Sequence, residues 1–133
     1  MIRNYYYLIV GLLLILFAVT HTVNGVMTGL PVLHNADIEN DIKITFTYVW
    51  HVIGIENLVL GIALLIMAFQ KNMSKVKFTT WVIIVVLIMR WIIITSFTLL
   101  DESGSIKQII PDTIAFFGVI TLLLIGTRIK VEK

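Results

Sequence analysis

Two histidines lie in neighbouring apolar stretches of this 133-residue chain, and their side chains are the first candidates for chemistry. Asn24 and Thr28 follow His21 at offsets of three and seven residues, which places these polar side chains on one face of a helix. His51 has a similar depth in the next stretch, roughly 10–12 Å from the nearer end in helical geometry. An imidazole can hydrogen-bond a polar ligand, transfer a proton near neutral pH, or ligate a metal or haem iron. His21 and His51 are therefore the candidate residues for each of these chemistries.

A carboxylate and a guanidinium form a second candidate site, because Glu56 and Arg90 lie near the middle of the second and third apolar stretches. At ~1.5 Å per residue, both charges would lie roughly 15–18 Å from the ends of their helices. A lone charge at that depth costs at least about 2.5–3.5 kcal/mol, so we expect a buried ion pair. The pair would either clamp two helices together or contribute to a ligand site in which Arg90 binds an acidic head group. Because His51 and Glu56 are about 140° apart around a regular helix, the histidines and the ion pair are expected to form two sites.

Membrane helices must position these residues, because 59% of the chain is hydrophobic and only 14% is charged. Ordinary soluble domains are about 45–50% apolar and about 25% charged. A soluble enzyme of this size could not bury so much apolar surface. The chain contains no cysteine, which excludes thiolate zinc sites, iron–sulfur clusters and disulfide scaffolds.

The apolar stretches predict an all-α integral membrane protein, with a four-transmembrane-helix bundle as a single transmembrane domain over residues 1–133. Each stretch has or approaches the roughly 20 apolar residues that a span needs. We expect the first span to stop at Pro31 and the fourth to begin at Pro111, since proline suits the first position of a helix. The predicted spans are about residues 5–29, 44–70, 78–100 and 111–127.

The segments that connect the spans differ in charge. The first and third loops contain the acidic residues, together with two lysines: Asp37, Glu39, Asp41, Asp101, Glu102, Lys43 and Lys107. The termini and the second loop contain the other basic residues, which are Arg3, Lys71, Lys75, Lys77, Arg128, Lys130 and Lys133. Because basic residues favour the cytoplasmic side, we predict an N-in/C-in protein of the plasma (inner) membrane with cytoplasmic termini. No basic patch interleaved with aromatic residues indicates a nucleic-acid partner.

Small residues recur at heptad-like spacing on the first two spans. The first seam is Gly11, Leu14, Ala18, His21, Gly25 and Thr28, and the second is Thr47, Trp50, Gly54, Asn57, Gly61, Leu64 and Ala68. Small side chains let the backbones of membrane helices approach closely. We therefore predict that these two spans pack as a tight antiparallel pair. Gly118 and Gly126 are expected to act similarly on the fourth span.

Polar residues concentrate in the outer halves of the spans, whereas the inner halves are almost pure hydrocarbon. This asymmetry predicts a polar pocket that opens outward and ends near Glu56 and Arg90. We expect it to bind a small amphiphilic ligand of the lipid, quinone or isoprenoid class. The residues expected to contribute are His21, Asn24, Thr28, His51, Glu56, Asn57, Arg90 and Ser96.

Three alternative functions remain open at this point. A membrane enzyme acting on a lipophilic substrate would use His21 or His51 as its general acid or base. A haem or metal carrier would use the same two histidines as ligands. A structural subunit of a membrane complex would need only its helix seams, with a partner membrane subunit or a second copy of the chain beside it.

Overall fold

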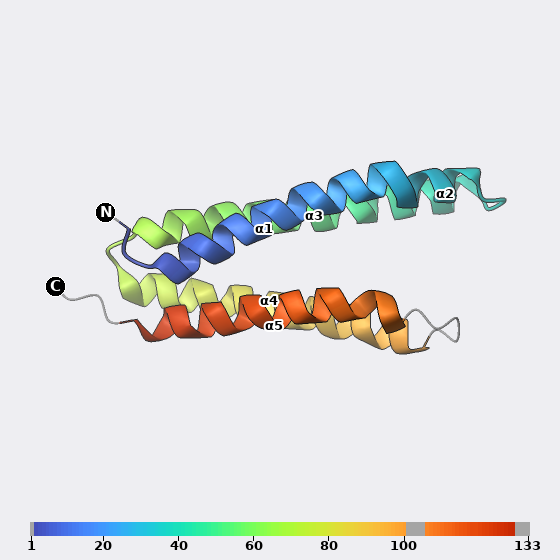
Figure 1. Ribbon diagram of the computed structural model, residues 1–133. Coiled ribbons are helices and arrows are strands. Elements are labelled where there is room, and N and C mark those ends of the chain that lie inside the picture. Colours follow the sequence, from blue (N-terminus) through green and yellow to red (C-terminus); the bar gives the residue numbers. More distant parts are fainter. Residues whose placement is uncertain (1, 101–105, 130–133) are drawn as a thin grey trace. The chain divides into compact units, whose positions relative to one another are not determined.

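The computed structural model describes residues 2–100 and 106–129, and every regular element within them is helical (Figure 1). The elements are α1 (Tyr5–Asn24), the π-helical turn η1 (Gly25–Gly29), α2 (Leu30–Asn35), α3 (Asn40–Phe69), α4 (Met73–Leu100) and α5 (Ile106–Arg128). The predicted all-α class is confirmed for these residues.

Four helical segments are long and apolar enough to cross a membrane, as predicted. They are Tyr5–Asn35, Asn40–Phe69, Ser74–Leu100 and Ile109–Arg128. All four begin before or end after the predicted limits. The third begins earlier because Asn72 caps the first turn of α4, where its Oδ1 accepts a hydrogen bond from the Lys75 amide at 3.3 Å.

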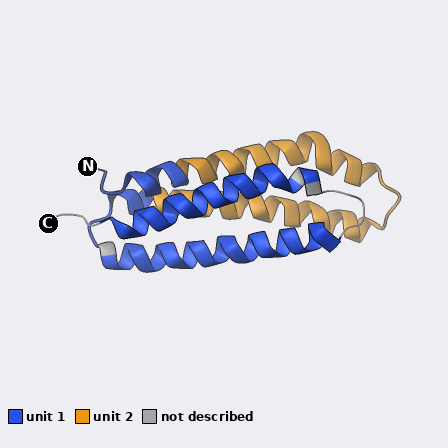
Figure 2. Ribbon diagram, turned by 60° about the horizontal axis from the view of Figure 1, so that its bottom comes forward, with its two compact units in different colours: residues 1–10, 66–133 blue, residues 11–65 orange. Residues whose placement is uncertain are grey.

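The chain forms two compact units, coloured separately in Figure 2. Unit 1 contains residues 1–10 and 66–133, and unit 2 contains Gly11–Leu65. Helices α1 and α3 each contribute residues to both units.

Unit 2 is built on the predicted antiparallel pairing of α1 with α3. A Cβ atom on Gly11 would lie 2.9 Å from the Gly61 carbonyl oxygen, and one on Gly61 would lie 2.8 Å from Ile15 Cγ1. Further along the same seam, a Cβ on Gly54 would lie 2.8 Å from Thr22 Oγ1. The glycines therefore let the two backbones approach, which confirms the predicted packing role of Gly54 and Gly61.

The first span continues past Pro31, contrary to the sequence expectation. At Gly25 the helix widens into η1, in which the Leu30 amide donates to the Gly25 carbonyl, and then resumes as α2 up to Asn35. Proline lacks an amide proton and crowds the carbonyl four residues before it. Pro31 is tolerated because it enters at the start of α2, where a missing donor is least costly.

In unit 1, the segment before α1 ties three helix ends together. The Ala68 carbonyl near the end of α3 accepts hydrogen bonds from the amides of Arg3 at 2.8 Å and Asn4 at 3.1 Å. The Asn4 side chain, only 1% exposed, donates from Nδ2 to the Gly126 carbonyl of α5 at 2.9 Å. Its Oδ1 caps α1 by accepting from the Tyr6 and Tyr7 amides.

The remainder of unit 1 is a hairpin of α4 and α5, which lie side by side (Figure 1). Trp91 stacks on Phe116 with ring centroids 5.0 Å apart, and its Nε1 donates to Thr113 Oγ1 at 3.3 Å. The apolar core of the hairpin includes buried side chains from both helices: Ile83, Ile84, Leu87, Val119 and Leu123.

Two expectations for the fourth span need correction. Pro111 lies inside α5 instead of at its start. The helix tolerates it there because a proline near a helix start removes only one hydrogen bond, the one to the carbonyl of Lys107. The two glycines also differ. A Cβ on Gly126 would lie 2.6 Å from the Tyr7 ring, whereas one on Gly118 meets nothing within 4 Å among the described residues. Gly126 therefore packs as predicted, and Gly118 does not.

Candidate functional site

His21 and Trp50 form a reciprocal contact between α1 and α3 in unit 2. Their rings stack with centroids 4.5 Å apart and an interplanar angle of 11°. The Trp50 Nε1 donates to the His21 carbonyl oxygen at 3.1 Å. The His21 Nε2 lies 3.1 Å from the Trp50 carbonyl oxygen in return. We call this arrangement the His21–Trp50 clasp.

The clasp determines what the His21 imidazole can do. A carbonyl oxygen only accepts hydrogen bonds, so the contact requires a proton on Nε2. That nitrogen is then unable to ligate a metal or remove a proton from a substrate while the clasp is closed. In this conformation His21 is a helix-pairing residue, and Nδ1 is the ring nitrogen left for other chemistry.

The π-helical turn makes room for the indole. A Cβ on Gly25 would meet the Trp50 ring, at 2.6 Å from Cδ1 and closer still to Nε1. Gly29 faces the far edge of the same ring, with Trp50 Cη2 3.6 Å from its ideal Cβ position. Segments of π-helix occur frequently at functional sites. Here, the turn and its two glycines form the seat of one aromatic side chain.

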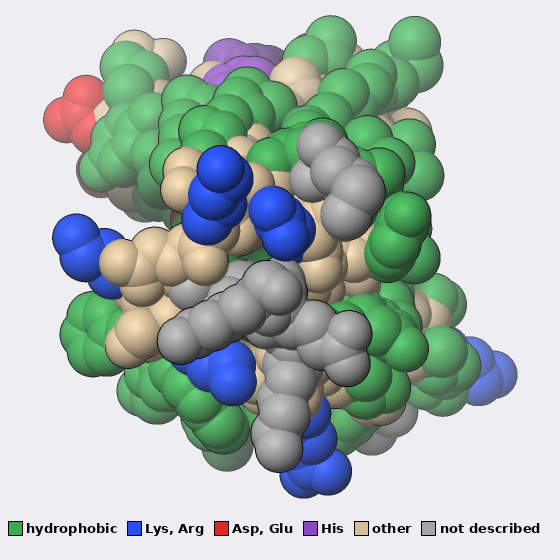
Figure 3. All heavy atoms as spheres, turned by 90° about the vertical axis from the view of Figure 1, so that its left-hand side faces the viewer, with side chains coloured by type: hydrophobic (Ala, Val, Ile, Leu, Met, Phe, Trp, Pro, Cys, Tyr) green, Lys and Arg blue, Asp and Glu red, His purple; other side chains and the backbone are tan. Residues whose placement is uncertain are grey.

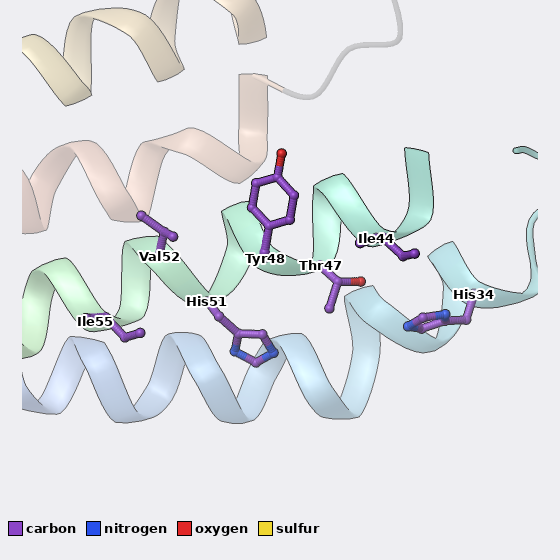
Figure 4. Close-up of a pocket in the computed structure, with 7 residues that line it drawn as sticks. All are labelled: His34, Ile44, Thr47, Tyr48, His51, Val52 and Ile55. Atoms are coloured by element: carbon purple, nitrogen blue, oxygen red, sulfur yellow. The ribbon is translucent and has the colours of Figure 1, made fainter. Parts of the chain in front are cut away.

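An open groove of about 400 Å³ lies along α3 and is lined by neither residue of the clasp (Figure 4). Six of its lining residues come from α3, and His34 comes from the last turn of α2. The α3 residues are Ile44, Thr47, Tyr48, His51, Val52 and Ile55. Their successive spacings of three, one, three, one and three residues place them on a single helical face. We call this feature the α3 groove.

The lining of the α3 groove is almost wholly apolar. The α2 end and the middle contain Ile44 together with the two histidines, Thr47 and Tyr48, and the other end contains Val52 and Ile55 (Figure 4). The Thr47 hydroxyl donates to the Lys43 carbonyl at 2.8 Å. Polar atoms contribute very little to the surface that a ligand in the groove would meet. No charged side chain is among the lining residues.

A lysine hydrogen bond fixes the end of the α3 groove that His34 lines. Lys43 Nζ donates to the His34 carbonyl oxygen at 2.9 Å, which satisfies one of the free carbonyls at the end of α2. A cation is also favourable at this end of a helix. Because this bond joins α2 to the first turn of α3, it keeps His34 beside the α3 face.

The structure separates several residues that were expected to share one pocket. His51 lines the α3 groove, whereas His21 is in the clasp. Asn24 and Thr28 are exposed, and the Thr28 hydroxyl donates to the Asn24 carbonyl at 2.6 Å. Ser96 is exposed on α4, in unit 1.

The three polar residues expected near the middle of the spans, Glu56, Asn57 and Arg90, all have interaction partners. Glu56 and Arg90 are half-buried and Asn57 is buried, and each has a polar or electrostatic partner. Glu56 belongs to unit 2 and Arg90 to unit 1, so their ion pair stays a prediction. Within residues 2–100 and 106–129, no three metal-ligating side chains of His, Cys, Asp or Glu come together.

The predicted site omits three residues of this region. Trp50 belongs to the predicted seam without a link to His21, and neither His34 nor Tyr48 is among the expected ligand contacts. The periodic pattern from Ile44 to Ile55 contains the signal for the groove face, because it follows one side of a 3.6-residue helix.

No protein-family model, curated protein or solved structure matches this chain.

Proposed function

We propose that this protein binds a small amphiphilic molecule of the lipid, quinone or isoprenoid class in the α3 groove. The observation that carries the proposal is the apolar lining of the groove, which has His34 and His51 among its residues. The apolar chain of an amphiphile would lie along this lining, and a histidine would orient its polar head. Ligand sites are commonly apolar, with a few polar groups that orient the ligand.

The size and setting of the groove agree with this proposal. A volume of about 400 Å³ lies in the ordinary range for small-molecule sites. The groove is open along α3, so a ligand chain longer than the groove could extend into surrounding lipid. The four apolar helices would place such an opening within a bilayer.

The clasp supports the proposal by making the groove rigid. Trp50 directly precedes His51. The Trp50 ring is held by one hydrogen bond and a stack, and the Trp50 backbone carbonyl is held by the His21 ring. These contacts oppose rotation of α3 about its axis, so His51 is presented to the groove before any ligand arrives. A preformed site loses less entropy on binding than a flexible one.

Photo-crosslinking with a diazirine-bearing isoprenoid alcohol tests the proposal. The full chain in mild detergent is irradiated with the probe, and the labelled peptides are located by mass spectrometry. We expect labels on α3 between Ile44 and Ile55. Val52→Trp would fill the groove and reduce labelling by at least about tenfold, as expected when a site loses about 1.4 kcal/mol of binding.

A matched variant controls for general effects of a tryptophan. Val49 is 44% exposed and Val52 is 56% exposed, and both are on the same two turns of α3. Val49 does not line the groove. Val49→Trp should therefore label like the wild type. Equal labelling of the two variants, or labels distributed evenly over all four helices, would refute groove binding.

A further inference from the structure

The end of unit 1 that contains the N-terminal segment is strongly basic. The Asn4 and Ala68 hydrogen bonds hold the start of α1, the end of α3 and the last turn of α5 together there. The start of α4 follows Ala68 within five residues, so it belongs to the same end. The described basic residues of this end are Arg3, Lys71, Lys75, Lys77 and Arg128. We call this set the basic end.

Acidic side chains do not offset this charge within unit 1. Among its described residues, 2–10, 66–100 and 106–129, the one acidic residue is Asp112. It lies near the start of α5, whereas the basic end is at the last turn of that helix. Lys and Arg side chains are visible over this end of the molecule in Figure 3.

The charge at the start of α4 also opposes the helix dipole. Lys75 is in the first turn, which contains no acidic residue. The amino end of a helix carries a partial positive charge and favours anions. Such a local conflict is a cost to the folded chain unless an external anion offsets it.

Exposed aromatic side chains accompany the basic end. Tyr5 on the first turn of α1 and Phe78 and Trp81 on the first turns of α4 are all exposed. Tyrosine and tryptophan concentrate where a membrane meets water, at the level of the lipid head groups. This second observation indicates a lipid surface and not a soluble anion.

We propose that the basic end binds the head groups of anionic phospholipids at one face of the membrane. The phosphates of the lipids would pair with the lysine and arginine side chains, and the exposed aromatic rings would lie at the same level. This inference is independent of the α3 groove, which belongs to unit 2. It needs only that the apolar helices span the bilayer.

Competition between two lipids tests this inference. The full chain in mild nonionic detergent is mixed with equal amounts of phosphatidylglycerol and phosphatidylcholine that have identical acyl chains. Native mass spectrometry then gives the ratio of the two lipids retained. We expect the wild type to retain phosphatidylglycerol preferentially. Equal retention of both lipids overturns the proposal.

Variants that remove lysine charges test whether the preference for phosphatidylglycerol depends on the basic end. Each lysine near an anionic surface contributes roughly a fivefold effect at low salt, so K71Q/K75Q/K77Q should lower the preference at least about tenfold. Lys75 and Lys107 offer a matched pair, since both are exposed lysines in the first turn of a helix of unit 1, at opposite ends. Lys75→Gln should lower the ratio and Lys107→Gln should not. Equal effects of the two substitutions overturn the assignment to this end.

Two further measurements keep the test decisive. If the triple variant does not fold, raising the salt for the wild type from about 0.01 M to about 1 M shortens the Debye length from about 30 Å to about 3 Å. The lipid preference should then disappear, and a salt-independent preference contradicts the proposal.

Loss of the preference on adding inorganic phosphate equimolar to the lipid identifies a site for free phosphate instead, which also contradicts the proposal. Val52→Trp should leave the ratio unchanged, which separates this test from that of the α3 groove.

Discussion

The substitution Gly25→Ala tests whether the π-helical turn exists to seat Trp50. The added methyl group would lie against the indole, at 2.6 Å from Cδ1, so the ring has to move away from η1. Movement of the ring breaks the stack with His21 and the hydrogen bond that Trp50 Nε1 donates. Without the stack, the His21 ring is no longer held against the Trp50 carbonyl, so the second hydrogen bond is lost as well. The seam between α1 and α3 then loses its most specific contact.

The expected loss of stability follows from these contacts. Each hydrogen bond contributes about 0.5–1.5 kcal/mol and the stacked pair contributes a similar amount. Alanine regains up to about 1 kcal/mol over glycine in a helix. The net free energy of unfolding should therefore fall by about 2 kcal/mol. Reversible unfolding in mixed micelles, followed by far-UV circular dichroism, measures this difference.

The same substitution at Gly118 is the control, because a Cβ there meets no atom within 4 Å among the described residues. Gly118→Ala should be neutral, or more stable by up to about 1 kcal/mol. Gly25→Ala should also cost almost nothing in a Trp50→Ala background, where the indole is absent. A cost of about 2 kcal/mol in both backgrounds would show that the steric reasoning is wrong.

Three further predictions concern the helix contacts. Asn4→Ala removes the cap of α1 and the donor to the Gly126 carbonyl, and should lower the free energy of unfolding by about 2 kcal/mol; an unchanged unfolding curve in micelles would contradict this assignment. Gly61→Val forces α1 and α3 apart and should cost about 1–3 kcal/mol by the same assay, whereas a stable variant would mean that the seam is not tight. Thr113→Val removes the acceptor of the Trp91 indole and should shift the fluorescence of that tryptophan with a stability loss near 1 kcal/mol, about the value of one hydrogen bond; identical spectra would argue against the bond.

The sequence by itself determined the helices and one of their interfaces. Apolar length and low charge are sufficient to predict four spans, because a backbone in lipid must satisfy its own hydrogen bonds. The seam from Gly11 to Gly25 and its counterpart around Gly54 and Gly61 could be predicted as well. Their spacing is a local property of each helix, and small residues are the main way for membrane helices to approach closely.

Only the tertiary structure decided which polar groups meet. His21 and His51 have equal depth in the sequence pattern, yet one ring pairs with Trp50 and the other lines the α3 groove. Their positions around the two helix axes separate them. The contact of Asn4 with Gly126 joins residues 122 positions apart, so no local pattern could predict it. Pairings of this kind depend on how the helices dock, which the periodicity of any one helix does not specify.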